Sequence, residues 1–124
     1  MFFSVVIPTY NRLPILQKCL RALENQQIPA GSAISGYEIV LVDDGSTDGT
    51  LAWLQEEAAE FPHVRSHEQN HQGPAAARNL GVEKASGDTI IFIDSDLVVT
   101  ENFLQAHAQA LTQADSDRVF TYGR

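Results

Sequence analysis

Short apolar runs rich in β-branched residues constrain most strongly what this chain can fold into. Four of them span residues 3–7, 37–42, 64–67 and 89–93, and three are nearly continuous rather than alternating. Continuous apolar runs are typical of strands that are covered on both faces, as in a parallel sheet. The runs therefore predict a mainly parallel sheet, and residues 119–122 predict the start of one more strand.

Segments with helical spacing lie between these runs. Side chains at steps of three or four mark four segments: Leu16, Leu20, Leu23 and Gln27; Leu51, Leu54 and Ala58; Ala76, Ala77 and Leu80; Leu104, Ala108 and Leu111. The segment Ser46–Asp48 predicts a cap and first-turn acid for the second helix, and Gly73-Pro74 predicts the start of the third. Strands alternating with helices through right-handed crossovers predict a Rossmann-like, doubly wound α/β fold with helices on both faces.

Size, charge and cysteine content narrow the class of protein. The 124 residues suit one domain over residues 1–124, and the net charge of −8 argues against a nucleic-acid strand or an anionic membrane as partner and favours a bound cation. Cys19 is the only cysteine, and no apolar stretch approaches the roughly 20 residues that span a bilayer. We expect a cytoplasmic protein, with any attachment to the inner face of a membrane supplied by other sequence.

Polar segments follow three of the predicted strands. They read PTYNR after the first strand, DDGSTD after the second and DSD after the fourth. In doubly wound sheets, ligands bind at the carboxyl ends of the strands, near the point where the strand order reverses. We therefore expect one functional site just after Ile7, Val42 and Ile93.

Asp94 and Asp96 predict a metal site. They are two residues apart, so in extended chain both carboxylates point to the same side, where a cation between them would relieve their repulsion. Mg²⁺ and Mn²⁺ prefer oxygen ligands and often take one or two carboxylates together with substrate phosphates. The alternative is that Asp94 begins a turn and Asp96 caps a helix that starts near Thr100.

Three further positions are candidates for nucleotide binding. Asp43 or Asp44 can accept a hydrogen bond from a base N–H or a ribose hydroxyl, although the Asp-Gly pair is also a plain turn signal. Tyr10 can stack on a base, or it can be an ordinary half-buried tyrosine. Arg78, in the second turn of the third helix, can reach a base or a phosphate, or it can form a surface ion pair.

Other polar residues favour structural interpretations. The histidines His63, His67 and His71 recur every four residues, but the first two flank a predicted strand, so this spacing does not build a helical metal site and we expect them to be solvated or structural. Cys19 lies within the first predicted helix and is expected to be a small core residue. Residues 28–37 predict an exposed loop.

The motifs SVVIPTYNR, EIVLVDDGSTDGT and NHQGPAAARNLGVEKASGDTIIFIDSD, in this order and spacing, resemble the family 2 glycosyltransferases. The resemblance covers the chain from about residue 3 to its end and implies the nucleotide-binding half of a GT-A fold. It implies a nucleotide site of Pro8, Thr9, Tyr10, Asp43, Asp44, Arg78, Asp94 and Ser95, and a Mn²⁺ or Mg²⁺ site of Asp94 and Asp96.

The resemblance also implies a reaction, which is inverting, metal-dependent transfer of a sugar from a nucleotide-diphospho-sugar, with UDP as the expected nucleotide and an unknown acceptor. Family members place the catalytic base well beyond the D-x-D segment. The acids that follow here, Glu101, Asp115 and Asp117, lie in or beside the predicted fourth helix, so no base is named. We expect a donor-binding portion, cut before the acceptor-binding part, that self-associates through its open sheet edge.

Three alternatives belong to other classes. The run IIFIDSDLV fits the first motif of haloacid-dehalogenase-type phosphatases, and a phosphoacceptor receiver domain has a similar length and acidic pair. Both need a lysine further along, and none follows Lys84. A non-enzymatic nucleotide-binding module is the third alternative, and the sequence does not separate it from part of an enzyme.

Overall fold

A parallel sheet forms the centre of the molecule. A computed structural model describes residues 1–112 and 122–123. Its strands are β1 (Phe2–Thr9), β2 (Gly36–Asp43), β3 (Val64–Glu68), β4 (Thr89–Ile93) and β5 (Tyr122–Gly123), in the order β3-β2-β1-β4-β5 with every pairing parallel. The four strands expected from the apolar runs are confirmed, whereas most of the strand expected at 119–122 lies outside the described residues.

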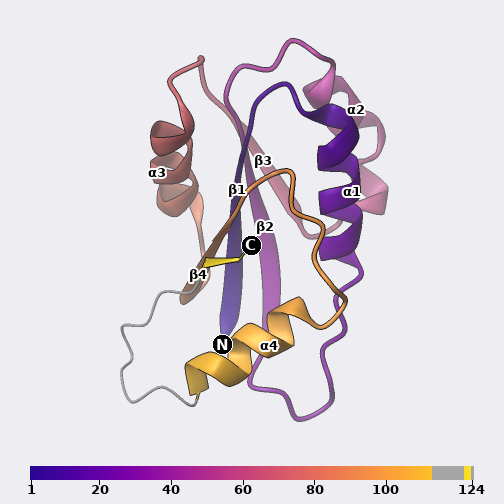
Figure 1. Ribbon diagram of the computed structural model, residues 1–124, viewed down its shortest axis with the longest axis vertical. Helices are drawn as coiled ribbons and strands as arrows, with labels where there is room; N and C mark the ends of the chain where they lie inside the picture. The colour runs from indigo at the N-terminus through magenta and orange to yellow at the C-terminus, as the bar shows by residue number, and fades with distance from the viewer. Residues whose placement is uncertain (113–121, 124) are drawn as a thin grey trace.

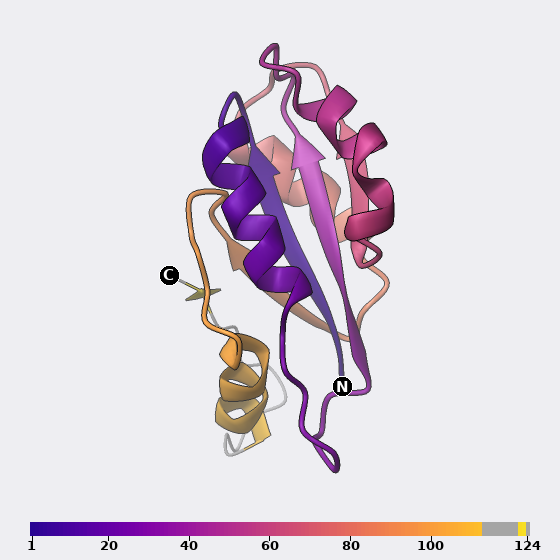
Figure 2. The same ribbon diagram turned by 90° about the vertical axis from the view of Figure 1, so that its right-hand side faces the viewer.

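Helices cover both faces of this sheet. The helices are α1 (Leu13–Glu24), α2 (Thr50–Glu56), a short 3₁₀ turn (Ala58–Glu60), α3 (Pro74–Lys84) and α4 (Phe103–Thr112). Figures 1 and 2 show α1 and α2 on one face and α3 on the other. The doubly wound α/β prediction is therefore confirmed. Within the described residues, no helix has the length and apolar character needed to cross a membrane.

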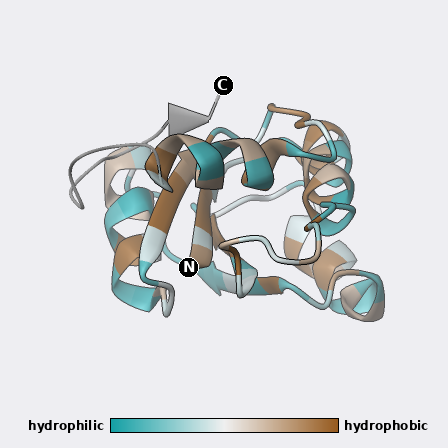
Figure 3. Cartoon of the chain, turned by 90° about the horizontal axis from the view of Figure 1, so that it is seen from below, coloured by the Kyte–Doolittle hydropathy of each residue, from teal (hydrophilic) through white to brown (hydrophobic). Residues whose placement is uncertain are grey.

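The larger core lies between the sheet and α1. Alternate strand residues point toward this face, and the fully buried ones include Phe3, Val5, Ile7, Ile39, Leu41, Ile91 and Ile93. Leu16, Leu20 and Leu23 of α1 pack onto them, as their spacing predicted. The helices in Figure 3 are banded in hydrophilic and hydrophobic colours, as expected for amphipathic helices with one face on a sheet.

Helix α3 lies close to the opposite face. A side chain at Gly81 would place its Cβ 2.3 Å from Cγ1 of Val6, so only glycine lets the helix approach β1 this closely. Pro74 is the first helical residue and Gly73 precedes it with a φ of 99°. The predicted start of this helix is confirmed.

Some predicted boundaries are wrong. Helix α2 begins at Thr50 with Gly49 as its cap, so residues 46–48 precede the helix and put no acid in its first turn. Gln27 lies beyond α1, where its backbone N–H donates to the carbonyl of Glu101. This contact belongs to the segment after β4, which runs back beside α1 to α4 (Figure 2).

The expected loop at 28–37 is also only partly correct. Gly36 and Tyr37 belong to β2, and Ile34 and Tyr37 are buried. The backbone N–H of Ser35 donates to the carbonyl of Met1, at 2.7 Å. The segment is therefore an anchored connection that packs against the amino end of β1. The prediction of an exposed loop weighed its small, turn-forming residues and gave no weight to the apolar Ile34 and Tyr37.

Candidate functional site

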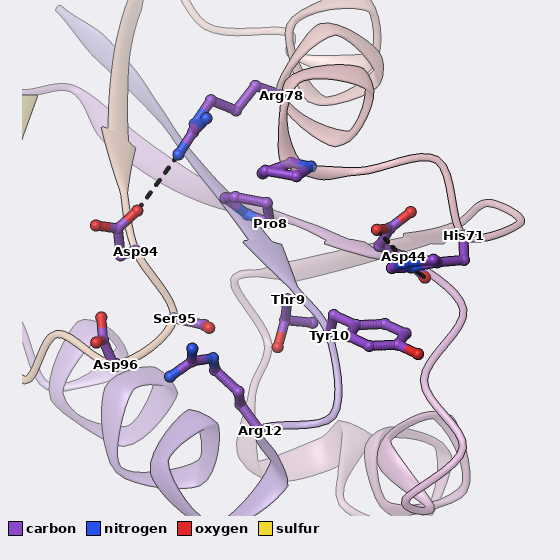
Figure 4. Close-up of a pocket in the computed structure, with 11 residues that line it drawn as sticks. Pro8, Thr9, Tyr10, Arg12, Asp44, His71, Arg78, Asp94, Ser95 and Asp96 are labelled. Atoms are coloured by element: carbon purple, nitrogen blue, oxygen red, sulfur yellow. Dashed lines mark hydrogen bonds and ion pairs between the residues drawn. The ribbon is translucent and has the colours of Figure 1, made fainter.

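A cleft opens at the carboxyl ends of β1, β2 and β4, where the strand order reverses. Its volume is about 360 Å³. It is lined by Pro8, Thr9, Tyr10, Arg12, Asp44, His71, Pro74, Arg78, Asp94, Ser95 and Asp96 (Figure 4). The three polar segments expected to converge therefore do so, and every predicted site residue except Asp43 lines the cleft.

The loop after β1 contributes one wall. Thr9 is 3% exposed, and its Oγ1 has no hydrogen-bond partner within the described residues. Tyr10 is 41% exposed, and its ring lies 4.2 Å from the ring of His71, measured between centroids. Arg12 lies at the other end of the cleft, beside Ser95 and Asp96 (Figure 4). This wall therefore offers an aromatic face and a cation.

Asp44 holds the loop between β3 and α3. One carboxylate oxygen accepts from the side chain of Gln69 and the backbone N–H of Gln72, at 2.8 and 2.7 Å. The other accepts from the N–H of Gly73 and faces Nδ1 of His71, both at 3.0 Å. Burial opposes ionisation, but these hydrogen bonds and the charge of His71 outweigh it and hold the pKa of Asp44 below its ordinary value.

Asp43 lies outside the cleft, unlike the prediction. It is the last residue of β2 and fully buried, and its Oδ1 accepts from the N–H and the hydroxyl of Ser46. Asp44, the first residue after β2, lines the cleft instead. Asp43 thus stabilises a turn inside the fold, whereas Asp44 forms part of the wall of the cleft.

Asp94 and Asp96 form the opposite wall. The N–H of Leu97 donates to the carbonyl of Asp94, so the segment is a turn and the expected extended chain is wrong. Both carboxylates nevertheless line the cleft. Asp94 begins this turn, as the alternative stated, whereas α4 begins at Phe103, so Asp96 does not cap a helix near Thr100.

These two carboxylates fit a cation that is shared with a ligand. The Asp94 side chain is 44% exposed and contacts Nη2 of Arg78 at the long distance of 3.5 Å. Asp96 is exposed and makes no hydrogen bond or ion pair with the part of the chain that the structure describes. No three acidic, histidine or cysteine side chains within residues 1–112 are grouped to hold a metal. A cation at these two carboxylates would need further oxygen ligands, such as water or the phosphates of a bound molecule.

Sequence reasoning did not assign three lining residues to the site, and one of them, Pro74, was predicted only as the start of a helix. His71 was grouped with the other histidines, but its position between a strand end and the start of α3 could have placed it at this rim. Arg12 belongs to the first polar segment, PTYNR, but the sequence analysis assigned it no function. His63 is structural as expected, because it contacts Glu24 at 2.6 Å and stacks on Tyr37.

Cys19 behaves as the core residue that was predicted. It is fully buried on α1. Burial, with the nearby charge of Asp96, raises the pKa of the thiol to about 12. The thiol therefore stays neutral and is no nucleophile. Of the acids considered as a base, Glu101 accepts from Gln27 and does not line the cleft, whereas Asp115 and Asp117 lie outside the described residues.

Comparisons with known proteins agree on one family. The model of Glycosyl transferase family 2 matches residues 4–121. The glycosyltransferase AglE of Haloferax volcanii is 35% identical over 127 residues, which cover 98% of this chain and 40% of AglE. The chain thus spans well under half the length of this relative.

Solved structures share the fold. Residues 1–349 of Staphylococcus aureus TarS, in complex with UDP-GlcNAc, match with a TM-score of 0.78 and 31% identity over 94% of this chain and 33% of that one. The mannosyltransferase PcManGT of Pyrobaculum calidifontis, in complex with GDP-Man and Mn²⁺, matches with a TM-score of 0.77 and 27% identity over 90% of this chain and 32% of that one. The two neighbours hold different nucleotides, so they leave the base preference of this cleft open.

Proposed function

This chain belongs to glycosyltransferase family 2, and on that basis we propose that its cleft binds a nucleotide-diphospho-sugar, with uridine as the nucleoside and a divalent cation at Asp94 and Asp96. The observation that carries the proposal is the convergence of an aromatic ring, a buried carboxylate, two arginines and two exposed carboxylates in one cleft. Such a set offers stacking, hydrogen bonding and charge to the three parts of a nucleotide diphosphate.

The end of the cleft at Tyr10 and Asp44 is suited to a base. The Tyr10 ring supplies a stacking surface. Asp44 can accept an imide N–H of uracil only after one of its four present donors leaves. His71 is the most exposed of the four groups, at 60% for its side chain, whereas Gln69 is partly buried and the other two are backbone groups of the loop. His71 is therefore the group we expect to leave.

The other end of the cleft is suited to a diphosphate. Arg12 and Arg78 line the cleft and attract the negative charge, and their guanidinium groups donate hydrogen bonds in pairs to phosphate oxygens. Asp94 and Asp96 would hold Mn²⁺ or Mg²⁺. When bound, this cation neutralises the charge that builds on the departing nucleoside diphosphate.

The transfer itself is proposed to invert the anomeric carbon. An acceptor hydroxyl attacks the face opposite the leaving group after a base takes its proton. Among the described carboxylates of the cleft, Asp44 is held by its donors and the other two are assigned to the cation. We therefore place the base and the acceptor site in the part of family 2 enzymes that this chain does not span. A cytoplasmic location and self-association stay predictions.

Calorimetric titration tests the donor site. UDP, GDP and dTDP are titrated with and without Mn²⁺ into the chain, and into Asp94→Asn and Asp96→Asn. We expect UDP to bind most tightly and Mn²⁺ to strengthen its binding. Either substitution should weaken UDP binding about tenfold and remove most of the Mn²⁺ effect, because it removes a charged carboxylate oxygen that would coordinate the cation.

Glu83→Gln is the matched control, because Glu83 is an exposed acid near the far end of α3. It should bind UDP and Mn²⁺ like the unmodified chain. Equal affinity for UDP with and without Mn²⁺ would contradict the metal assignment. Tighter binding of GDP than of UDP would contradict the base assignment and leave the metal assignment intact.

A further inference from the structure

Two loops at the rim of the cleft are joined by hydrogen bonds between residues far apart in sequence. The N–H of Asn11 donates to Oγ of Ser46 at 2.9 Å, and the N–H of Thr47 donates to Oδ1 of Asn11 at 2.7 Å. The N–H of Leu13 donates to Oδ2 of Asp48 at 3.0 Å. We call these contacts of Asn11 and Leu13 with Ser46, Thr47 and Asp48 the loop brace.

The backbone at Asn11 has an unusual conformation that accompanies these contacts. Asn11 has a φ of 50°, and among the described residues it is the one non-glycine residue with a positive φ. Asparagine tolerates this conformation better than most residues, since its short polar side chain can hydrogen-bond locally. Here the side chain binds the second loop instead, so the unusual backbone and the brace are set by the same residue.

The two sequence neighbours of Asn11, Tyr10 and Arg12, both line the cleft. Tyr10 lies next to His71 and Arg12 next to Ser95 and Asp96, at opposite ends of the site (Figure 4). Asn11 and Arg12 are exposed, so packing alone does not fix this loop. Fixing an exposed loop before a ligand arrives removes an ordering cost from binding.

The sequence DGSTD therefore has a use other than helix capping. Ser46 and Thr47 do not cap α2, since that helix begins at Thr50 with Gly49 as its cap. Asp48 contacts both sides, because one carboxylate oxygen accepts from Thr50 and the other from Leu13. Its pKa is lowered, since the hydrogen bonds from Thr50 and Leu13 outweigh the opposing effect of burial.

We propose that Asn11 and Asp48 are positioning residues, which hold Tyr10 against the base and Arg12 against the diphosphate of the bound nucleotide. The proposal rests on the proposed function, because it needs a nucleotide in this cleft. Neither residue lines the cleft, so both act through the two side chains that the brace presents.

A double-mutant cycle tests this role by calorimetry with UDP and Mn²⁺. Asn11→Gly keeps the positive φ but removes Oδ1, and we expect it to weaken UDP binding about tenfold. Asn11→Asp keeps an oxygen acceptor and should stay within about threefold of the unmodified chain. With Tyr10→Ala and Arg12→Ala both present, Asn11→Gly should change the affinity less than twofold, because the groups through which it acts are gone.

Asn25→Gly is the matched control, since Asn25 ends α1 and bonds only to Arg21 in the described structure. It should leave UDP binding unchanged. A tenfold loss by Asn11→Gly in both backgrounds would overturn the positioning role while leaving the donor site in place. Absence of UDP binding by the unmodified chain would instead overturn the proposed function, and the positioning role with it.

Discussion

At the scale of single residues, the protein groups already bonded to Asp44 limit which hydrogen bonds this carboxylate can accept from a ligand. Its two oxygens have four lone-pair sites, and four protein donors face them. A ligand N–H therefore competes with a protein group rather than entering a vacant position. The competitor is His71, whose ring also covers part of Tyr10.

His71→Ala should therefore raise the affinity for UDP. The substitution frees an acceptor site on Asp44 and uncovers the Tyr10 ring, and we expect a two- to fivefold lower Kd by calorimetry. His67→Ala on β3 is the control, because His67 does not line the cleft. A weaker affinity of His71→Ala would mean that the imidazole contacts the nucleotide instead of yielding to it.

The same residues show what the sequence can and cannot predict about a site. Tyr10, Asp94 and Arg78 follow from their places at strand ends and at a helix start, because topology brings those places together. Asp43 lies outside the cleft, because the face to which a residue points depends on where its strand ends. His71 was missed because its contacts with Asp44 and Tyr10 join segments that are distant in sequence.

At the scale of elements, the approach of α3 to the sheet places Arg78 over the cleft. Gly81→Ala would put a methyl group against Val6, at a spacing that forces the helix to move. Overpacking costs about 1–3 kcal/mol, and alanine returns about 1 kcal/mol of helix propensity. We expect a net loss of up to about 2 kcal/mol in the free energy of unfolding, measured with urea.

Val6→Ala provides the matched background for this prediction. It removes the γ-carbon that the new methyl group would meet, so only the gain in helix propensity remains. Gly81→Ala should then be neutral or stabilising. An equal loss in both backgrounds would show that the close contact with β1 is not the reason for glycine at this position.

Element boundaries were predicted less well than the elements themselves. The strands and the third helix follow from apolar periodicity and from proline, which act locally. The start of α2 does not, because the side chains at 46–48 find partners in the loop after β1 instead of the helix that follows them. The sequence of a capping motif does not determine which backbone N–H groups its side chains will bind in the fold.

At the scale of the whole molecule, a buried carboxylate ties the sheet to the segment that leads into β4. Glu38 on β2 accepts from the hydroxyl of Ser4 on β1, and from the N–H and the hydroxyl of Ser86 before β4. Burial opposes its ionisation, but these hydrogen bonds, with the charge of Arg65, hold the pKa below the ordinary value of 4.5. The folded protein therefore stabilises the ionised form of Glu38.

This linkage predicts how stability depends on pH. A carboxyl group with a lower pKa in the folded state stabilises the fold above its unfolded pKa, and this contribution is lost as the pH falls through the folded value. Urea unfolding between pH 6 and pH 3 should therefore show a steeper loss of stability for the unmodified chain than for Glu38→Gln. Glu83→Gln, which removes an exposed acid, should follow the unmodified chain. Parallel curves for all three proteins would mean that the acid sensitivity arises at other carboxylates, among them Asp44, Asp48 and Asp88, whose pKa values are also lowered.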